Sequence, residues 1–386
     1  MSDRPLLNRR LDGLGTTIFA EMSALANATG AINLGQGFPD TDGPEEIREA
    51  AVRALREGKG NQYPPGAGIP ELRAAVAGHQ QRFYGLAFDP GSEVLVTAGA
   101  TEAIAASLLA LVEPGDEVIA FEPYYDSYAA CIAMAGGVRV PLPLRAPAFR
   151  PDLDELRAKI TPRTRLLLLN SPHNPTGTVL TPEELSGIAA LAVEHDLLVV
   201  TDEVYEHLVF EGSHHPIAAL PGMRERTVSI SSAGKTYSYT GWKIGWVTGD
   251  APLVTAVRSA KQYLTFVSGG PLQYAIAEAL QLPDTFFTEF RASMHRKRDL
   301  LADGLRSAGF RVYEPEGTYF VTTDISPLGE EDAYAFCRAL PERCGVAAVP
   351  VSVFYDDPEA GRSQVRFTFC KREDVLEEAV ERLRRL

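Results

Sequence analysis

The segment Ser231-Ser232-Ala233-Gly234-Lys235-Thr236 lies between two apolar runs, residues 227–230 and 244–248, which predict two buried strands. An isolated loop lysine usually keeps its amine in water. A lysine among small and hydroxylated residues between buried strands is instead placed for desolvation, and a desolvated amine can form a Schiff base with an aldehyde. Residues elsewhere in the chain decide between these two interpretations.

Gly234-Lys235-Thr236 also resembles the end of a phosphate-binding P-loop. That motif requires a glycine five residues before the glycine that precedes the lysine. Position 229 is Ser229, so the spacing excludes a nucleotide hydrolase of this type.

The composition is that of a globular protein with one large and one smaller domain: 386 residues, 45% of them apolar and 23% charged. The net charge of −14 argues against a nucleic-acid-binding surface. No apolar run approaches the roughly 18 residues of a membrane span, and residues 1–10 lack an apolar signal core. The four cysteines show neither metal-ligand spacing nor a disulfide ladder, so we expect no metal and a cytoplasmic location.

Strand-like and helical patterns alternate through the middle of the chain, which is typical of an α/β fold. The apolar runs 166–169 and 197–200 are continuous, so we expect strands buried on both faces of a mainly parallel sheet between helices. Expected strands are 93–97, 117–121, 165–169, 197–201, 227–230 and 244–248, and expected helices are 44–56, 102–112, 126–135, 182–195 and 252–263.

The alternation ends near residue 285. A long helix over 284–308 is expected there, followed by short strands at 319–323 and 365–369 and by helices at 331–340 and 373–383. We therefore expect a large α/β domain over 44–284 and a smaller α+β domain formed by 1–43 with 285–386.

Polar groups follow the ends of four expected strands, where ligands collect in parallel sheets. They are Tyr124 and Tyr125, Asn174, Asp202 and Lys235. Each alone has an ordinary explanation: an aspartate can cap a helix, and an Asn-Pro turn is common. An aromatic ring, an amide, a carboxylate and a lysine at one edge together indicate a binding site.

A possible phosphate cradle precedes the helix expected over 102–112. The turn Gly99-Ala100-Thr101 would present free backbone N–H groups at the positive end of the helix dipole. The three-glycine dinucleotide fingerprint is absent, which disfavours a nicotinamide enzyme.

Together these residues match the needs of pyridoxal 5′-phosphate (PLP), which requires an amine for its aldehyde, an anion for its ring nitrogen, donors for its phenolic oxygen, an aromatic face and a phosphate cradle. In that order the chain offers Lys235, Asp202, Asn174 with Tyr205, Tyr125, and the Gly99 turn with Ser232 and Lys243.

The motifs at 174–177, 202–205, 232–236 and 241–246 resemble those of class I aminotransferases of PLP fold type I. Segments 32–40, 61–63 and 365–371 are similar to the branch that holds kynurenine/glutamine and methionine aminotransferases and the actinobacterial N-succinyldiaminopimelate aminotransferases. The resemblance covers essentially the whole chain. It implies a mainly parallel seven-stranded sheet between helices, a smaller α+β domain and a homodimer with shared active sites.

The resemblance also implies a role for each matching position. Lys235 would bind PLP and move the proton at substrate Cα, Asp202 would face the ring nitrogen, and Arg366 would grip the substrate carboxylate. The remaining implied positions are Asn174 and Tyr205 at the phenolic oxygen, Tyr125 on the ring, Gly99, Ala100, Thr101, Ser232 and Lys243 with Tyr63 of the partner subunit at the phosphate, Gly37 at the carboxylate, and Phe19, Phe38 and Phe266 around the substrate side chain.

The expected activity is transfer of an amino group from an amino acid to a 2-oxo acid. Candidate donors are N-succinyl-LL-2,6-diaminopimelate and methionine, glutamine or aromatic amino acids, with 2-oxoglutarate or another 2-oxo acid as acceptor. A PLP-dependent carbon–sulfur β-lyase is the alternative enzyme. A non-enzymatic PLP-binding regulator is disfavoured, because such proteins carry an additional basic DNA-binding domain.

Overall fold

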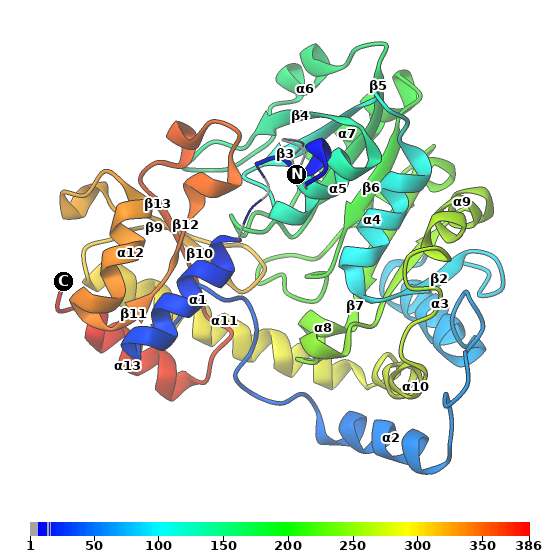
Figure 1. The fold of residues 1–386 in the computed structure, drawn as a ribbon, viewed down its shortest axis with the longest axis horizontal. Coiled ribbons are helices and arrows are strands. Elements are labelled where there is room, and N and C mark those ends of the chain that lie inside the picture. The colour runs from blue at the N-terminus through cyan, green and yellow to red at the C-terminus, as the bar shows by residue number, and fades with distance from the viewer. Residues whose placement is uncertain (1–6, 14, 16) are drawn as a thin grey trace, which may run out of the picture.

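The computed structural model describes residues 7–13, 15 and 17–386 and contains a seven-stranded sheet in the order β2-β8-β7-β6-β5-β3-β4 (Figure 1). Every neighbouring pair is parallel except those that involve β8, which is antiparallel to β2 and to β7. The mainly parallel seven-stranded sheet is therefore confirmed. Its strands are β2 (Val94–Thr97), β3 (Glu117–Glu122), β4 (Val138–Pro143), β5 (Thr164–Asn170), β6 (Leu198–Asp202), β7 (Thr227–Ser232) and β8 (Gly245–Gly249).

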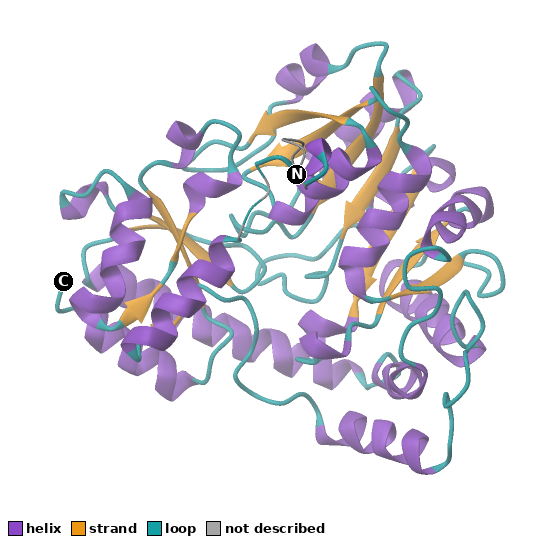
Figure 2. Cartoon of the chain, in the orientation of Figure 1, coloured by secondary structure: helices purple, strands orange, loops and turns teal. Residues whose placement is uncertain are grey.

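Alternate side chains of the central strands enter two different apolar cores, because successive residues of a strand point to opposite faces. Leu166 and Leu168 pack into one core, and Leu167 and Leu169 pack into the other. Helices α4 (Gly99–Leu111), α5 (Asp126–Ala135) and α9 (Ala251–Lys261) cover the first face, and α6 (Leu153–Lys159) and α7 (Pro182–Glu194) cover part of the second (Figure 2).

A third apolar core covers the β2–β8 end of the second face. It is built from α2 (Glu45–Arg56), α3 (Pro70–Tyr84), α10 (Gly270–Ala279) and the start of α11 (Asp284–Ser307). The sequence patterns did not predict α3, α6, α10 or β4. Both prolines of β4 lie in a strand at the border of the sheet, where a missing backbone N–H is tolerated.

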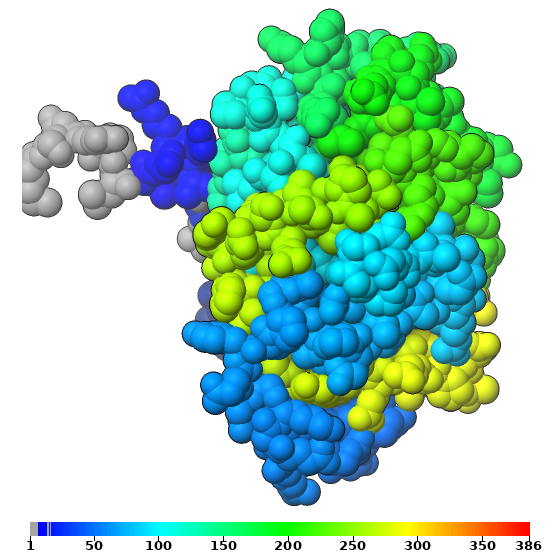
Figure 3. All heavy atoms as spheres, turned by 90° about the vertical axis from the view of Figure 1, so that its right-hand side faces the viewer, coloured from blue at the N-terminus to red at the C-terminus, as the bar shows by residue number. Residues whose placement is uncertain are grey.

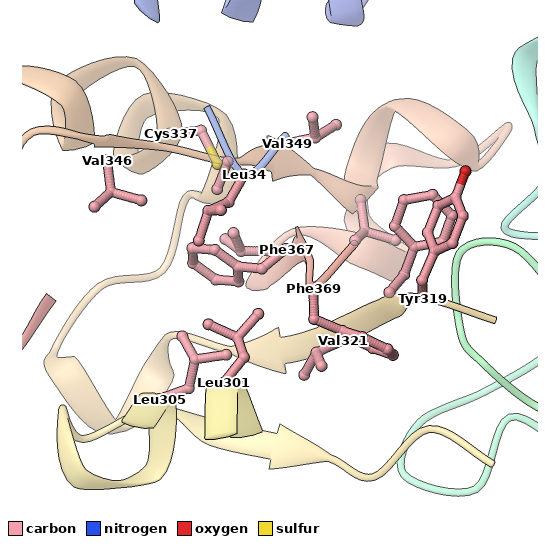
Figure 4. Packing of buried hydrophobic residues seen from close by; sticks show 14 of the residues in the cluster. Leu34, Leu301, Leu305, Tyr319, Val321, Cys337, Val346, Val349, Phe367 and Phe369 are labelled. Carbon is pink, nitrogen blue, oxygen red and sulfur yellow. The ribbon is translucent and has the colours of Figure 1, made fainter. Parts of the chain in front are cut away.

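A smaller antiparallel sheet in the order β12-β13-β10-β9 lies beside the large one. Figure 4 shows its core, in which Leu34, Leu301 and Leu305 pack in one apolar cluster with Phe367 and Phe369. The elements of this part are α1 (Ile18–Thr29), β1 (Ile32–Asn33), β9 (Arg311–Tyr313), β10 (Phe320–Asp324), α12 (Ala333–Cys344), β11 (Val346–Ala347), β12 (Val349–Pro350), β13 (Gln364–Thr368) and α13 (Glu373–Leu383).

Two elements connect the parts of the molecule. Strand β1 pairs in parallel with β11 in a separate two-stranded sheet, which brings the N-terminal segment to the smaller part of the molecule. Helix α11 starts in the core of the large sheet with Phe287 and continues into the core of the small sheet with Leu301 (Figure 1).

Within the described ranges, no helix is both long and apolar enough to cross a bilayer.

Figure 3 shows one face on which the blue to light-blue segments near α2 and α3 lie beside the yellow-green segment near α9 and α10. Tyr63 of the first segment is 81% exposed and contacts Phe266 of the second edge to face, with ring centroids 5.4 Å apart.

Candidate active site

A cavity of about 270 Å³ opens at the carboxyl edge of the parallel strands. It brings together residues from the large sheet, the N-terminal segment and the small sheet. Its lining is Phe19, Gln36, Gly37, Gly99, Ala100, Thr101, Ile104, Tyr125, Tyr128, Asn170, Asn174, Asp202, Val204, Tyr205, Ser232, Gly234, Lys235, Thr240, Lys243, Ile244, Phe320 and Arg366.

Lys235 reaches the cavity from α8 (Ala233–Thr236), a single turn that begins directly after β7. Its amine donates to the carbonyl oxygen of Gly37 at 3.5 Å. Burial lowers the pKa of Lys235 to about 8, since desolvation disfavours the ammonium form, although the Asp202 charge opposes this effect. At pH 7 roughly a tenth of Lys235 is therefore a free amine, far more than for an exposed lysine, and the free amine is the form that a nucleophile requires.

Asp202 is the last residue of β6 and is 5% exposed. Its Oδ2 accepts a hydrogen bond from the Tyr128 hydroxyl at 2.7 Å, and its Oδ1 accepts one from the Val204 N–H at 3.3 Å. Burial raises the pKa of Asp202 to about 6, while both hydrogen bonds and the Lys235 charge favour the carboxylate. A buried carboxylate that faces a cavity is suited to a cationic ligand group.

Asn170 fixes the position of Asn174, and the sequence patterns did not identify it. It ends β5 opposite Asp202, and its amide donates to the Asp202 carbonyl at 2.8 Å. Its Oδ1 accepts the Asn174 N–H at 2.8 Å. The one sequence signal was an asparagine at the end of a buried strand.

The two adjacent tyrosines, Tyr124 and Tyr125, lie in different surroundings. Tyr125 lines the cavity. Tyr124 is buried elsewhere: its hydroxyl donates to Asp356 at 2.6 Å, and Arg139 lies over its ring. The structure therefore favours Tyr125 for stacking on a ligand.

Tyr205 lies against the small sheet, with its ring 5.2 Å from that of Tyr319 in an edge-to-face contact. Burial raises the pKa of the Tyr205 phenol, so it is a hydrogen-bond donor at neutral pH. The Tyr319 hydroxyl donates to the Gly37 carbonyl at 2.5 Å and fixes the N-terminal segment beside Lys235. The sequence patterns placed a strand near Tyr319 but gave it no role.

The first turn of α4 forms one end of the cavity. Its N–H groups have no acceptor within the helix, and they lie at the positive end of the helix dipole. Gly99 has φ +74, and a side chain on Gly245 would lie 2.6 Å from the Gly99 backbone, so both positions require glycine. Lys243 donates to the Thr101 hydroxyl at 3.4 Å, and Ser232 lines the same cavity.

Arg366 lines the cavity from strand β13, and its side chain is 1% exposed. Its two terminal nitrogens donate to Asn174 Oδ1 and to the Gly35 carbonyl, each at 2.9 Å, while Nε has no protein partner. The Phe320 ring lies 4.0 Å from its guanidinium carbon. Among the described contacts the neighbouring Gly37 N–H has no acceptor, so a carboxylate could be bound here by both groups.

Three of the residues expected at the site, Tyr63, Phe266 and Phe38, do not line this cavity. Tyr63 is far more exposed and packs on Phe266, which is also absent from the lining. Phe38 is 46% exposed, and the Lys371 amine lies over its ring. All the other expected site residues, from Phe19 to Arg366, border the cavity.

A buried polar cluster links the loop after Asp202 to neighbouring elements. Glu206 accepts hydrogen bonds from Tyr84 at 2.6 Å and from Ser231 at 2.5 Å. His79 and His207 share one hydrogen bond between their Nε2 atoms at 2.8 Å. These contacts fix the loop to α3 and to the end of β7.

The chemical groups around the cavity match those that PLP requires. An amine of lowered pKa, a buried carboxylate and a helix N-terminus with a lysine and a serine lie around one space. The Arg366 Nε without a partner and the free Gly37 N–H leave capacity for a second, carboxylate-bearing ligand.

The chain belongs to the family "Aminotransferase class I and II", whose sequence model matches residues 29–383. It is an aminotransferase, and the family implies PLP as cofactor.

The sequence similarity to individual relatives extends over nearly the whole length of both chains. The chain is 54% identical to a probable N-succinyldiaminopimelate aminotransferase of Mycobacterium tuberculosis, over 97% of each chain. It is 43% identical to the methionine aminotransferase of Escherichia coli, over 100% of each chain. The solved N-succinyldiaminopimelate aminotransferase of M. tuberculosis superimposes with a TM-score of 0.96, covering 98% of this chain and 99% of that one. The solved methionine aminotransferase of E. coli gives 0.95, covering 99% and 100%.

Proposed function

We propose that this aminotransferase uses PLP bound to Lys235 to move the amino group of an uncharged amino acid to a 2-oxo acid. The observation that carries the proposal is the meeting of the Lys235 amine and the Asp202 carboxylate in one cavity. Lysine is suited to bond the cofactor aldehyde, and aspartate to face its ring nitrogen.

The proposed cofactor contacts use the other lining residues. Tyr125 would lie against the ring, and Asn174 and Tyr205 would donate to the phenolic oxygen. The N–H groups of Gly99, Ala100 and Thr101, with Ser232 and Lys243, would hold the phosphate.

Each side chain then has one task in the reaction. When bound, PLP supplies an electron sink for the charge left at substrate Cα. Arg366 binds the substrate carboxylate with its guanidinium fork, and Gly37 donates its N–H to the same group. Lys235 would take the proton from substrate Cα, because its lowered pKa suits a base near neutral pH.

The preference for an uncharged side chain is supported by the charges around the site. Arg366, Lys235 and Lys243 are the cations of the described lining, and each already has a role. A second cavity of about 660 Å³ shares Phe19 and Tyr125 with the first. Its described lining contains two charged residues, both acidic. This surface is suited to methionine, glutamine or aromatic donors and disfavours a second carboxylate.

N-succinyl-LL-2,6-diaminopimelate is the second candidate donor, and it is favoured by the 54% identity to the mycobacterial relative. Its distal carboxylates require a cation that the two described cavities do not offer, so the partner subunit would have to supply it.

We also propose a homodimer in which Tyr63 serves the phosphate of the partner's site, because its ring is 81% exposed on its own chain. The proposed domains are 44–284, and 1–43 with 285–386. The proposed location is the cytoplasm, supported by four free cysteines.

Replacing Lys235 tests the proposal directly. Lys235→Ala should abolish both the covalent attachment of PLP, measured by mass spectrometry after borohydride trapping, and turnover. Lys261→Ala is a matched control, since Lys261 is also buried but bonds backbone carbonyls away from the cavity. Multiple turnover by Lys235→Ala would refute the assignment.

A panel of amino donors with 2-oxoglutarate and with pyruvate identifies the substrate. We expect methionine, glutamine or an aromatic amino acid to give higher kcat/KM than N-succinyl-LL-2,6-diaminopimelate. Ammonia and pyruvate formed from a sulfur amino acid without any 2-oxo acid would instead support the β-lyase.

A further inference from the structure

One enclosed contact of the site belongs to Tyr128, which no sequence motif identified. Its side chain lines the cavity and is 3% exposed. The hydroxyl donates to Asp202 Oδ2 at 2.7 Å, which is the shortest bond that this carboxylate makes. We propose that Tyr128 is a positioning residue that keeps Asp202 ionised and oriented, so that the ring nitrogen of PLP stays protonated. This inference rests on the proposed function.

The position of Tyr128 follows from the first turn of α5. Tyr125 is the N-cap residue, and the Tyr128 N–H donates to its carbonyl at 2.9 Å. The two rings meet edge to face with centroids 5.8 Å apart. One helical turn therefore places one tyrosine on the expected ring face and the other beneath the carboxylate that faces the ring nitrogen.

The Tyr128 hydroxyl can act only as a donor toward Asp202. Burial and the Asp202 charge hold the pKa of this phenol well above its usual range, so it stays protonated. A hydrogen bond from a neutral hydroxyl stabilises the carboxylate over the acid, and in a buried site this effect is large.

The other groups near Asp202 cannot replace this bond. The Val204 N–H is more distant, at 3.3 Å, and Glu203 disfavours the Asp202 charge. The Lys235 ammonium favours that charge, but its nitrogen is consumed when it binds the cofactor. Among the protein groups described around Asp202, Tyr128 is therefore the main support of its carboxylate when the cofactor is bound.

Tyr128→Phe removes the hydroxyl and keeps the ring that packs in the core. Tyr124→Phe is the matched control, because Tyr124 is also buried and its hydroxyl also donates to a carboxylate, Asp356, outside the cavity. Before binding is measured, thermal unfolding should show that both variants keep the melting temperature of the parent protein.

The test compares PLP with an analogue in which C–H replaces the ring nitrogen. For the full-length chain, Tyr128→Phe should weaken PLP binding by about 10- to 100-fold, the usual effect of losing a hydrogen bond to a buried charge. Binding of the analogue should change less than about twofold, since it has no ring nitrogen for Asp202 to stabilise. In enzyme loaded with ring-¹⁵N PLP, the nitrogen resonance should shift toward unprotonated pyridine in Tyr128→Phe and not in Tyr124→Phe.

A second variant separates positioning from packing. In an Asp202→Asn background, Tyr128→Phe should cause little further loss of PLP affinity, because both changes act through one carboxylate. Equal weakening for PLP and the analogue, full additivity with Asp202→Asn, or an unchanged ¹⁵N resonance would each overturn the inference. A parent chain that bound no PLP would refute the proposed function itself.

Discussion

Among single residues, Lys235 shows most directly how burial prepares the site for chemistry. Its pKa is lowered to about 8 from the ordinary value for lysine, first of all by desolvation. An amine attacks an aldehyde only when it is unprotonated, so the fraction of reactive protein rises as pH increases through this value.

The rate of PLP uptake by the cofactor-free chain should therefore rise with pH and be half-maximal near pH 8. A stopped-flow absorbance measurement between pH 6 and 10 checks this. Uptake that kept rising tenfold per pH unit to pH 10 would show that Lys235 has the pKa of an exposed lysine.

Arg366 is the residue whose geometry, as well as charge, should matter. Its guanidinium lies between aromatic rings, and its terminal nitrogens are held by Asn174 and Gly35. Lysine keeps the positive charge but cannot form the same planar fork. Arg366→Lys should lower kcat/KM for amino acids about 10- to 100-fold, mainly through KM.

An amine donor without an α-carboxylate serves as the control for this variant, because it makes no use of the fork. Its kcat/KM should be the same in Arg366→Lys and in the parent. An equal loss for both donors would mean that Arg366 supports the cavity and does not bind the carboxylate.

The residues that sequence reasoning found and missed differ in how they reach the cavity. Asp202, Asn174 and Lys235 follow strand ends, so the parallel sheet alone predicts that they meet. Tyr128 and Tyr319 reach the site from a helix turn and from the small sheet. Their positions depend on how elements pack, and a sequence pattern carries no information on that packing.

At the scale of elements, the strength of the local sequence pattern explains which helices and strands were predicted. Long helices with strong periodicity, such as α7 and α13, were placed within a residue of their observed ends. Strand β4 was missed, because its two prolines argue against a strand in the interior of a sheet. Helix α10 was missed, because its start, Gly269-Gly270-Pro271, is typical of a loop.

The packing of α11 on α13 makes a prediction at this scale. A Cβ on Gly304 would lie 2.2 Å from Val380 Cγ2, so alanine cannot fit without movement. Overpacking of this kind costs about 1–3 kcal/mol, more than the roughly 1 kcal/mol that alanine contributes through helix propensity. Gly304→Ala should lower the free energy of unfolding in urea.

Gly78 provides the matched case in helix α3. Nothing lies within 4 Å of its added Cβ, and it is exposed. Gly78→Ala should therefore raise the free energy of unfolding by roughly 0.5–1 kcal/mol. Combining Gly304→Ala with Val380→Ala should cost less than the sum of the two single changes, and simple additivity would contradict the close contact.

At the scale of the whole molecule, the proposed dimer determines whether each cavity is complete. Tyr63 does not line the cavity of its own chain, and its side chain is exposed. In the proposed assembly it crosses to the phosphate of the partner's site. Each active site then needs Lys235 from one subunit and Tyr63 from the other.

Mixing two impaired variants tests this arrangement, with activity measured above the average of the two variants alone. A heterodimer of Lys235→Ala and Tyr63→Ala contains one site that carries both defects. Its other site has Lys235 from the Tyr63→Ala chain and an intact Tyr63 from the Lys235→Ala chain. Unfolding and refolding an equal mixture gives about half heterodimers if assembly is random, so about one quarter of all sites should be of the parent kind. Recovery of roughly a quarter of the parent activity is the expected result. If Tyr63 served its own chain, every heterodimer site would keep one defect, and mixing would restore nothing beyond the average of the two variants.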